Sequence, residues 1–333
     1  ATKDLTPGDE VLTPAVTFPT TVAPIVQLGL VPVFFDAQVG SYTVNPALLD
    51  QAIGPRTRAM LIPHTLGIPA DLDAITDLCE RRDLILIEDT CDALGGRWRN
   101  AALGSFGSLA TLSFFTAHTV TTGEGGALLV NRPSLIRPAD SVASWSRDCW
   151  CKPGQTNTCG KRYGWTFEGC DLPAGYDHKN IYTSLGSNLK PTEMQAAVGV
   201  AQMARLPAFV QARRRNFWRL YMWLDDCTEH LILPDVDPRS SPAWFGFPIT
   251  CQEPGARDAL VRHLEAAKIE SRHIFAGNIL RQPGYRDIPH RLGSSLTESD
   301  RIMRDSFFVG VWPGLGEAEM DYIGETIRGW CRR

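Results

Sequence analysis

The fold of this chain is indicated first by the segment Leu84-Ile85-Leu86-Ile87-Glu88-Asp89, in which a short apolar run ends in two carboxylates. A continuous apolar run of this length is typical of a strand that is buried on both faces. Similar β-type runs alternate with helical runs, which predicts βαβ units and a mainly parallel sheet. The β-type runs are Val31–Phe35, Ala59–Ile62 and Leu84–Ile87, and the helical runs are Thr20–Leu28, Pro46–Ile53 and Leu72–Arg82.

The rest of the chain is expected to complete a large α/β domain over residues 1–205 and to form a smaller C-terminal α+β domain over residues 206–333. Residues 145–190 break the pattern, because they are rich in Gly, Pro, Asn, Cys and aromatic residues and show no sustained period. A segment so much longer than an ordinary connection is interpreted as a functional loop. The other expected elements are strands at Leu109–Phe114 and Ala127–Val130 and helices at Thr192–Leu206 and Ala208–Leu224.

Composition argues against several classes of partner. The 333 residues carry a formal charge of −4, so no general positive field would attract nucleic acid or anionic lipid. No apolar stretch approaches the roughly 18 residues needed to cross a bilayer, and the polar start does not resemble a secretory signal. These features predict a cytoplasmic protein with no membrane partner. The run Arg213–Arg215 is interpreted as a solvated helix face.

The cysteines point to a metal. There are nine of them, an odd number, and three lie close together between Cys149 and Cys159. This uneven spread is unlike the disulfide framework of a small secreted protein. Thiolates grouped in a reducing compartment suit either zinc or an iron–sulfur cluster, and the residue types alone do not separate the two.

Asp89 allows two readings. A carboxylate at the end of a buried strand could cap the N-terminus of a following helix. It also lies at the edge of the sheet where α/β proteins bind ligands, where it could pair with the ring nitrogen of a pyridine cofactor. One acid alone does not decide between the two.

A second segment favours the cofactor. The motifs SFFTAH (113–118) and TGEGG (122–126) resemble the DegT/DnrJ/EryC1/StrS sugar aminotransferases, a family of fold-type I pyridoxal-phosphate enzymes. The family has a Schiff-base lysine where this chain has His118. The resemblance covers nearly the whole chain and extends to TFPTT (17–21), EDTCDALG (88–95) and GSNLKPTEMQAA (186–197).

With His118 in place of the lysine, the chain resembles the nucleotide-sugar 3-dehydratases within this family. Without a lysine amine the cofactor, pyridoxamine phosphate (PMP), cannot be held covalently. The resemblance implies that His118 is the catalytic base, that Asp89 faces the ring nitrogen, that Phe18 stacks on the ring and that Ser113 contacts the phosphate. It also implies that Asn188 reaches the phosphate of a neighbouring subunit, which predicts a homodimer.

The start of the chain departs from the family pattern. The chain has no initiator Met, and the strand-like VLT (11–13) has no preceding element to pair with. The glycine-serine turn with which the family cups the phosphate would lie upstream of Ala1. We therefore expect the N-terminal part of the family fold to be missing.

The cysteine spacing resembles the iron–sulfur subgroup of these dehydratases. That resemblance implies a [2Fe–2S] cluster held by Cys91, Cys149, Cys151 and Cys159, and a reductase or ferredoxin that supplies electrons. Zinc remains the chemical alternative. His178, in the nearby YDHK (176–179), is expected to be structural. The remaining cysteines are interpreted as ordinary buried or surface residues: Cys79, Cys170, Cys227, Cys251 and Cys331.

Together these features predict an enzyme of deoxysugar biosynthesis, in a lipopolysaccharide or antibiotic pathway. The expected reaction is PMP- and cluster-dependent removal of the C3 hydroxyl from a nucleotide-linked 4-keto-6-deoxyhexose, with CDP and dTDP both open. Three alternatives stay open: a cluster-free 3-dehydratase of the GDP-sugar type, an aminotransferase, and a non-catalytic protein of the same fold. The missing lysine argues against an aminotransferase, and the four cysteines argue against the GDP type.

Overall fold

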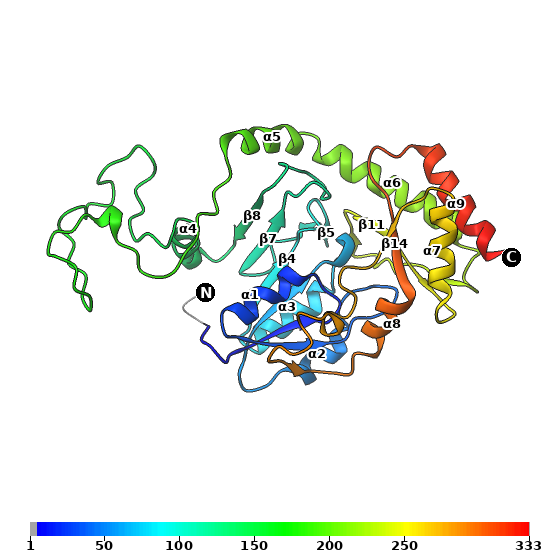
Figure 1. Ribbon diagram of the computed structural model, residues 1–333, viewed down its shortest axis with the longest axis horizontal. Coiled ribbons are helices and arrows are strands. Elements are labelled where there is room, and N and C mark those ends of the chain that lie inside the picture. The colour runs from blue at the N-terminus through cyan, green and yellow to red at the C-terminus, as the bar shows by residue number, and fades with distance from the viewer. Residues whose placement is uncertain (1–4, 333) are drawn as a thin grey trace. The chain divides into compact units, whose positions relative to one another are not determined.

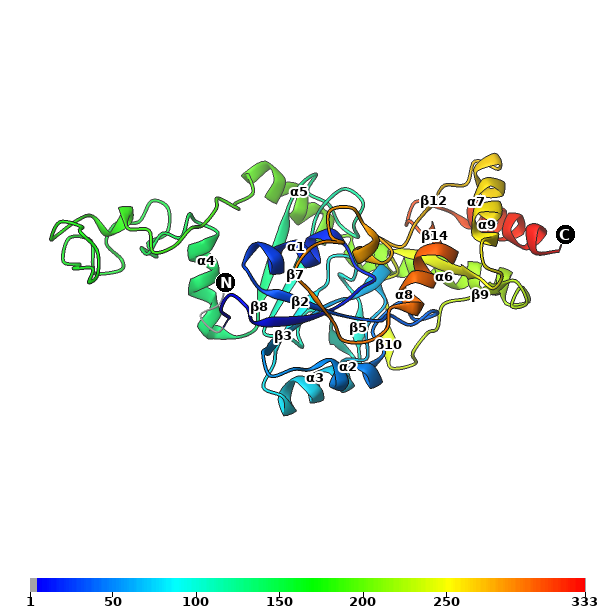
Figure 2. The same ribbon diagram turned by 60° about the horizontal axis from the view of Figure 1, so that its bottom comes forward.

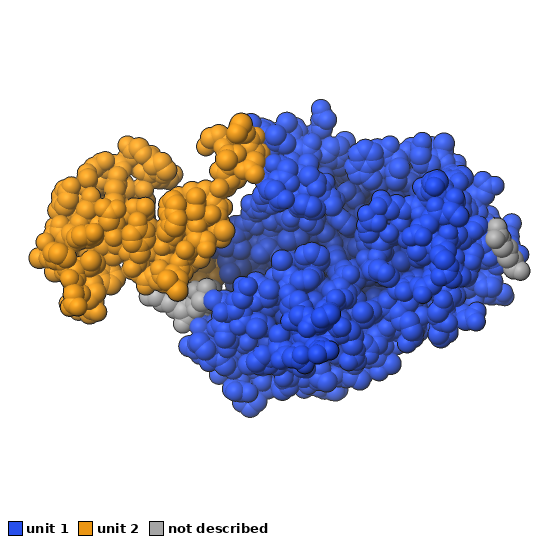
Figure 3. Space-filling view, viewed as in Figure 1, with its two compact units in different colours: residues 1, 3–131, 197–333 blue, residues 2, 132–196 orange. Residues whose placement is uncertain are grey.

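A computed structural model describes residues 5–332, which form two compact units (Figure 3). One unit runs to Asn131 and resumes at Ala197, and the other comprises Arg132–Ala196. The predicted boundary at residues 205 and 206 stays a prediction. None of the helices in the described range is long and apolar enough to cross a membrane.

The first unit is built on a seven-stranded sheet in the order β13-β2-β1-β3-β4-β7-β8 (Figure 1). Neighbouring strands are parallel except for β7 and β8, which are antiparallel. This confirms the mainly parallel sheet. The strands are β1 (Glu10–Pro14), β2 (Val31–Phe35), β3 (Thr57–Pro63), β4 (Ile85–Asp89), β7 (Leu109–Ser113), β8 (Gly126–Val130) and β13 (Arg291–Leu292).

Helices cover both faces of this sheet. Successive residues of a strand point to opposite sides, so apolar strands present side chains for packing on both faces. Val11 of β1 packs with Ile25 of α1 (Pro19–Gln27), whereas its neighbour Leu12 packs in the cluster that contains Leu49 and Ile75. Those two residues belong to α2 (Pro46–Ala52) and α3 (Leu72–Arg81). Figure 2 shows α1 on one side of the sheet and α2 and α3 on the other.

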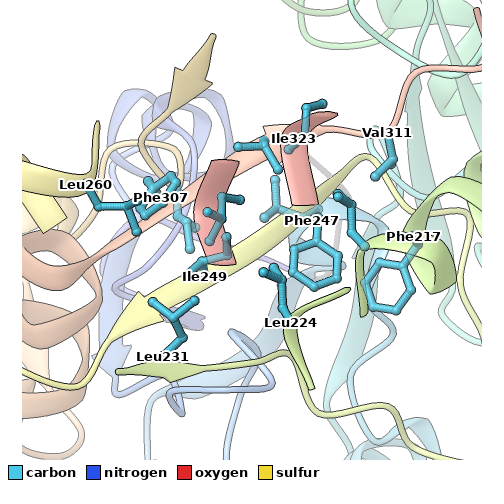
Figure 4. Packing of buried hydrophobic residues seen from close by; sticks show 14 of the residues in the cluster. Phe217, Leu224, Leu231, Phe247, Ile249, Leu260, Phe307, Val311 and Ile323 are labelled. Carbon is cyan, nitrogen blue, oxygen red and sulfur yellow. The ribbon is translucent and has the colours of Figure 1, made fainter. Parts of the chain in front are cut away.

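The C-terminal part of the first unit has its own antiparallel sheet, in the order β12-β14-β11-β9. Figure 4 shows Phe217, Phe247, Ile249 and Ile323 converging in the core between this sheet and its helices. A third, small sheet has the order β10-β5-β6. The elements are β5 (Arg97–Trp98), β6 (Ala101–Ala102), β9 (Leu231–Ile232), β10 (Ser240–Ser241), β11 (Gly246–Cys251), β12 (Ser271–Arg272), β14 (Ser306–Gly310), α6 (Leu206–Leu224), α7 (Ala256–Ala266), η4 (Ile279–Arg281), α8 (Thr297–Asp305) and α9 (Glu317–Cys331).

The second unit has little regular structure, as the composition of residues 145–190 predicts. Between α4 (Ile136–Val142) and α5 (Glu193–Met203) it contains a single short helix, η3 (His178–Asn180). Backbone hydrogen bonds such as His178 N–H to Arg162 O, at 2.9 Å, hold the loop together instead. Two further short 3-10 helices are η1 (Thr65–Gly67) and η2 (Pro133–Leu135).

Candidate active site

A cavity of about 700 Å³ lies at the carboxyl ends of β4 and β7. This is the edge of a parallel sheet where α/β proteins bind their ligands. Four of the residues predicted for catalysis and cofactor binding line it, namely Phe18, Asp89, Ser113 and His118. Cys91 and Asp92 line it as well, from the turn that follows β4. Residues far apart in the sequence are therefore brought together at one cavity.

Asp89 is held at this edge by two hydroxyl groups. Thr21 Oγ1 donates to its Oδ2 at 2.9 Å, and Thr111 Oγ1 donates to its Oδ1 at 3.2 Å. The Cys91 backbone N–H also donates to Oδ1, at 3.2 Å. The next element along the chain is strand β5, so Asp89 does not cap a helix and that alternative reading is wrong. Its carboxylate is instead a fixed acceptor at the cavity wall.

Glu88, the other carboxylate of β4, faces the opposite side and is fully buried. It accepts backbone N–H bonds at 2.8 Å from Gly104, Phe106 and Gly107. A side chain at Gly107 would bring its Cβ to 2.6 Å from the Leu86 carbonyl oxygen, so only glycine permits this close turn.

His64 completes the site around Glu88. The backbone N–H of Ala70 donates to His64 Nδ1, so Nε2 carries the hydrogen and donates to Glu88 at 3.1 Å. Burial alone would raise the pKa of Glu88, but the bond from His64 and the backbone N–H donors outweigh it and hold the pKa below its usual value. Glu88 and His64 therefore form a structural anchor at the cavity, which His64 lines, and sequence reasoning missed this anchor.

His118 lies beside a buried carboxylate. Its Nδ1 is 3.2 Å from Asp92 Oδ1, within ion-pair distance although the N–H direction is not aligned for a hydrogen bond. The ring packs between Phe115 and Phe245, with centroids at 6.4 and 5.7 Å. Burial raises the pKa of Asp92, against the opposing contact with His118. Because Nδ1 lies next to Asp92, Nε2 is the nitrogen left for chemistry.

Arg213 contradicts its predicted place on a solvated helix face. The side chain is buried, and it donates to the carbonyl oxygens of Trp244 and Phe245 at 3.1 and 3.0 Å. Burial lowers the pKa of Arg213 to about 10, an effect that the negative charge of nearby Asp92 opposes. The signal was present in the sequence, because Arg213 falls on the stripe of α6 that also buries Val210, Phe217 and Leu220.

The remaining cavity walls are largely aromatic. Phe18 precedes α1, is half exposed and contacts Phe275 edge to face, with centroids at 6.0 Å. Ser113, the last residue of β7, accepts a hydrogen bond from the Phe115 backbone N–H at 3.3 Å. An apolar cavity with a few fixed polar groups suits a flat aromatic ligand that carries charged substituents.

The second unit brings three of the four predicted metal ligands together. The sulfur atoms of Cys149, Cys151 and Cys159 all lie within 4.8 Å of one another. Burial raises the pKa of Cys149 to about 11, whereas a hydrogen bond from Thr158 lowers the pKa of Cys151 to about 6. The predicted fourth ligand, Cys91, belongs to the first unit.

Two further observations concern the predicted site residues. All nine cysteines lie within the described range and none forms a disulfide there. Asn188 also belongs to the second unit, where it is exposed and bridges to the backbone of Ser144. The roles assigned to the individual site residues stay predictions.

Comparison with known proteins gives consistent matches. A sequence model of the DegT/DnrJ/EryC1/StrS aminotransferase family matches residues 1–328. The chain is 45% identical over 321 residues to the lipopolysaccharide biosynthesis protein RfbH of Salmonella typhimurium, which covers 96% of this chain and 73% of the relative. It is 45% identical over 325 residues to the dTDP-4-dehydro-2,6-dideoxy-D-glucose 3-dehydratase of Saccharopolyspora spinosa, covering 97% and 70%.

Solved structures agree with the sequence matches. The Escherichia coli GDP-4-keto-6-deoxy-D-mannose-3-dehydratase with bound hydrated pyridoxal phosphate (PLP) superimposes with a TM-score of 0.84 at 26% identity. The match covers 98% of this chain and 82% of that chain. The fold is therefore that of the PLP-dependent aminotransferases, as the sequence predicts.

Proposed function

We propose that this chain, which belongs to the DegT/DnrJ/EryC1/StrS aminotransferase family, is a PMP-dependent enzyme that removes the C3 hydroxyl of a nucleotide-linked 4-keto-6-deoxyhexose. The observation that carries the proposal is His118, a residue without an amine, which lines the cavity beside buried Asp92. A histidine here can move a proton but cannot anchor the cofactor covalently. The relatives at 45% identity, one of them a 3-dehydratase by name, support dehydration over amino transfer.

The cavity fits PMP. Asp89, fixed by Thr21 and Thr111, would pair with the protonated ring nitrogen. Phe18 would stack on the ring, and Ser113 would bind the phosphate. When bound, the cofactor supplies an amine that condenses with the C4 ketone and a ring that accepts electrons.

His118 would act as the base. Asp92 faces Nδ1, so the ring would take up a proton at Nε2 while the carboxylate stabilises the resulting positive charge. Buried Arg213 would limit the cost of keeping Asp92 ionised. Loss of water at C3, followed by uptake of two electrons and two protons, replaces the C3–OH bond by C3–H.

The electrons require a donor. We propose that Cys149, Cys151 and Cys159, with Cys91, hold a [2Fe–2S] cluster that passes single electrons from a reductase or ferredoxin. The support is the grouping of three sulfur atoms within 4.8 Å, since thiolates are the usual cluster ligands. Zinc would suit the same sulfurs, so metal analysis must separate the two.

A homodimer with shared sites is part of the proposal. Helix α5 buries none of its residues, and its Met194, Val200 and Met203 are exposed. Large apolar side chains grouped on an uncovered helix are typical of a protein interface. A second copy of this chain would cover them and present its Asn188 to the phosphate.

The test uses anaerobically purified full-length protein. We expect two iron and two acid-labile sulfide per chain, and PMP- and reductase-dependent consumption of CDP- or dTDP-4-keto-6-deoxyglucose. Amino transfer from glutamate as the main reaction would overturn the dehydratase assignment. One zinc per chain without sulfide would overturn the cluster while leaving dehydration open.

A further inference from the structure

In the second unit, the side chain of His178 contacts both Asp148 and Cys159. His178 Nε2 is 2.6 Å from Asp148 Oδ2, and its Nδ1 is 3.4 Å from Cys159 Sγ. All three residues belong to Arg132–Ala196, the unit that also groups Cys149 and Cys151. The ring therefore bridges a carboxylate and one of the three grouped sulfurs.

The ring is held by two tryptophans and through its backbone. It is fully buried, stacks on Trp165 at 4.9 Å and meets Trp150 edge-on at 5.6 Å. His178 begins η3, which is capped by Asp177, whose side chain accepts from the Lys179 backbone N–H at 3.1 Å. A ring held in this way keeps its Nδ1 directed at the sulfur.

Asp148 sets which atoms act as donors. Its carboxylate is itself held by Arg137, whose guanidinium lies 3.5 Å away. It accepts from Nε2, and a metal-bound thiolate can only accept as well, so a ring between the two uses both nitrogens as donors. This is the arrangement in which a group outside the ligand set orients and tunes a ligand.

His178 does not belong to the ligand set itself. The sulfurs of Cys149, Cys151 and Cys159 lie within 4.8 Å of one another. Within residues 5–332, no nitrogen of His178 lies within that distance of all three sulfurs. His178 Nδ1 instead approaches the sulfur of Cys159, at 3.4 Å. We assign the ring a place one step outside the ligands, where it contacts one ligand sulfur.

We infer that His178, oriented by Asp148, is a positioning residue that donates a hydrogen bond to the Cys159 sulfur and raises the reduction potential of the cluster. The inference rests on the proposed cluster. Hydrogen bonds to ligand sulfurs are among the means by which proteins set cluster potentials, because they stabilise the extra negative charge of the reduced state. Loss of the donor is therefore expected to make the cluster harder to reduce.

The experiment compares two substitutions of equal size in the full chain. His178→Leu removes the donor, whereas His178→Asn keeps an N–H near the position of Nδ1. Asp171→Asn, at an exposed carboxylate of the same unit, controls for a change of charge alone. A mediated redox titration followed by visible absorption gives the potential, and iron and sulfide are counted in each sample.

We expect a more negative potential in His178→Leu, a value close to wild type in His178→Asn, and no shift in Asp171→Asn. An unchanged potential in His178→Leu at full iron content would overturn the inference and leave the cluster standing. Wild-type protein without iron would instead overturn the proposed cluster.

A second measurement applies if His178→Leu loses iron. Pulsed EPR of the reduced wild-type cluster, in protein labelled with ¹⁵N-histidine, should show one weak nitrogen coupling that His178→Asn removes. A strong coupling would make His178 a ligand, and no coupling would leave it without contact to the cluster. Either result contradicts the hydrogen bond.

Discussion

Replacing Asp92 by Asn tests how the proposed base is oriented. Asp92 is buried, and its Oδ1 lies 3.2 Å from His118 Nδ1. An amide of the same size removes the charge and can donate to Nδ1. That bond would leave the hydrogen on Nε2, the nitrogen that must accept a proton. We expect the variant to fold, to bind PMP and to lose proton transfer.

The size of the loss follows from the charge pair. Two unit charges 3.2 Å apart interact by about 5 kcal/mol at an effective dielectric constant of about 20. At about 1.4 kcal/mol for each factor of ten, this sets a ceiling of roughly 10³–10⁴ on the rate. Arg213 already compensates part of the charge of Asp92, so we expect a loss of about 10²–10³ in kcat, with KM little changed.

The assay follows release of deuterium from PMP labelled at C4′, in the presence of a CDP- or dTDP-4-keto-6-deoxyglucose. Asp50→Asn is the matched control, because Asp50 pairs with Arg82 at the surface. Release at the wild-type rate in Asp92→Asn would refute the argument that Asp92 orients His118. Loss of PMP binding in the same variant would assign Asp92 to the cofactor instead.

Four further predictions concern the anchor, the base, the metal and the dimer. Glu88→Gln should lower the free energy of unfolding by about 2–4 kcal/mol, because it weakens a buried network; equal denaturation midpoints would contradict this. The pKa of Glu88 is lower in the folded than in the unfolded state. The carboxylate therefore stabilises the folded state above the unfolded pKa, and this stabilisation is lost as pH falls through the folded pKa. The stability of Glu88→Gln should therefore vary less with pH below about 4.5 than that of the wild type. His118→Lys should bind PLP covalently, seen by mass spectrometry as an adduct after borohydride treatment, and should lose most dehydration; an unmodified mass would count against this placement of residue 118. Cys149→Ala should lose iron yet keep PMP and C4′ exchange, and retained iron with sulfide would rule out Cys149 as a ligand. Mixed chains of Asn188→Ala and His118→Asn should regain part of the activity, and hybrid dimers without recovery would exclude shared sites.

The parts of the fold that depend on local pattern could be predicted from the sequence. The strand at Val31–Phe35 matches β2 at both ends, and the other predicted strands and helices of the parallel sheet lie within a few residues of their observed bounds. The apolar periods of these runs fix their type before any tertiary contact forms. Helix α4, which buries none of its seven residues, was missed.

The electrostatic partners could not be predicted, because they lie far apart in the chain. His64 and Glu88 are separated by 24 positions. Neither residue is unusual by type, and only the packing of β3 against β4 brings them together. For Arg213 the prediction was wrong, because residue type suggested exposure. The arginine lies on the stripe of α6 whose apolar residues are buried, and it is buried with them. Tertiary packing decided both outcomes.

Glu88 accepts hydrogen bonds on one side of β4, whereas Asp89 lines the cavity on the other. This arrangement limits how the chain can vary in length. The connection between α3 and β4 is short, and one residue added or removed there would shift β4 by one position. The sheet could still pair, but the two acids could not both keep their places. An added residue would bring Glu88 to the cavity and Ile87 to the backbone N–H groups of Gly104, Phe106 and Gly107. Over evolution, insertions and deletions should therefore be rarer in this connection than substitutions, and variation in length should accumulate in segments that do not set the register of β4.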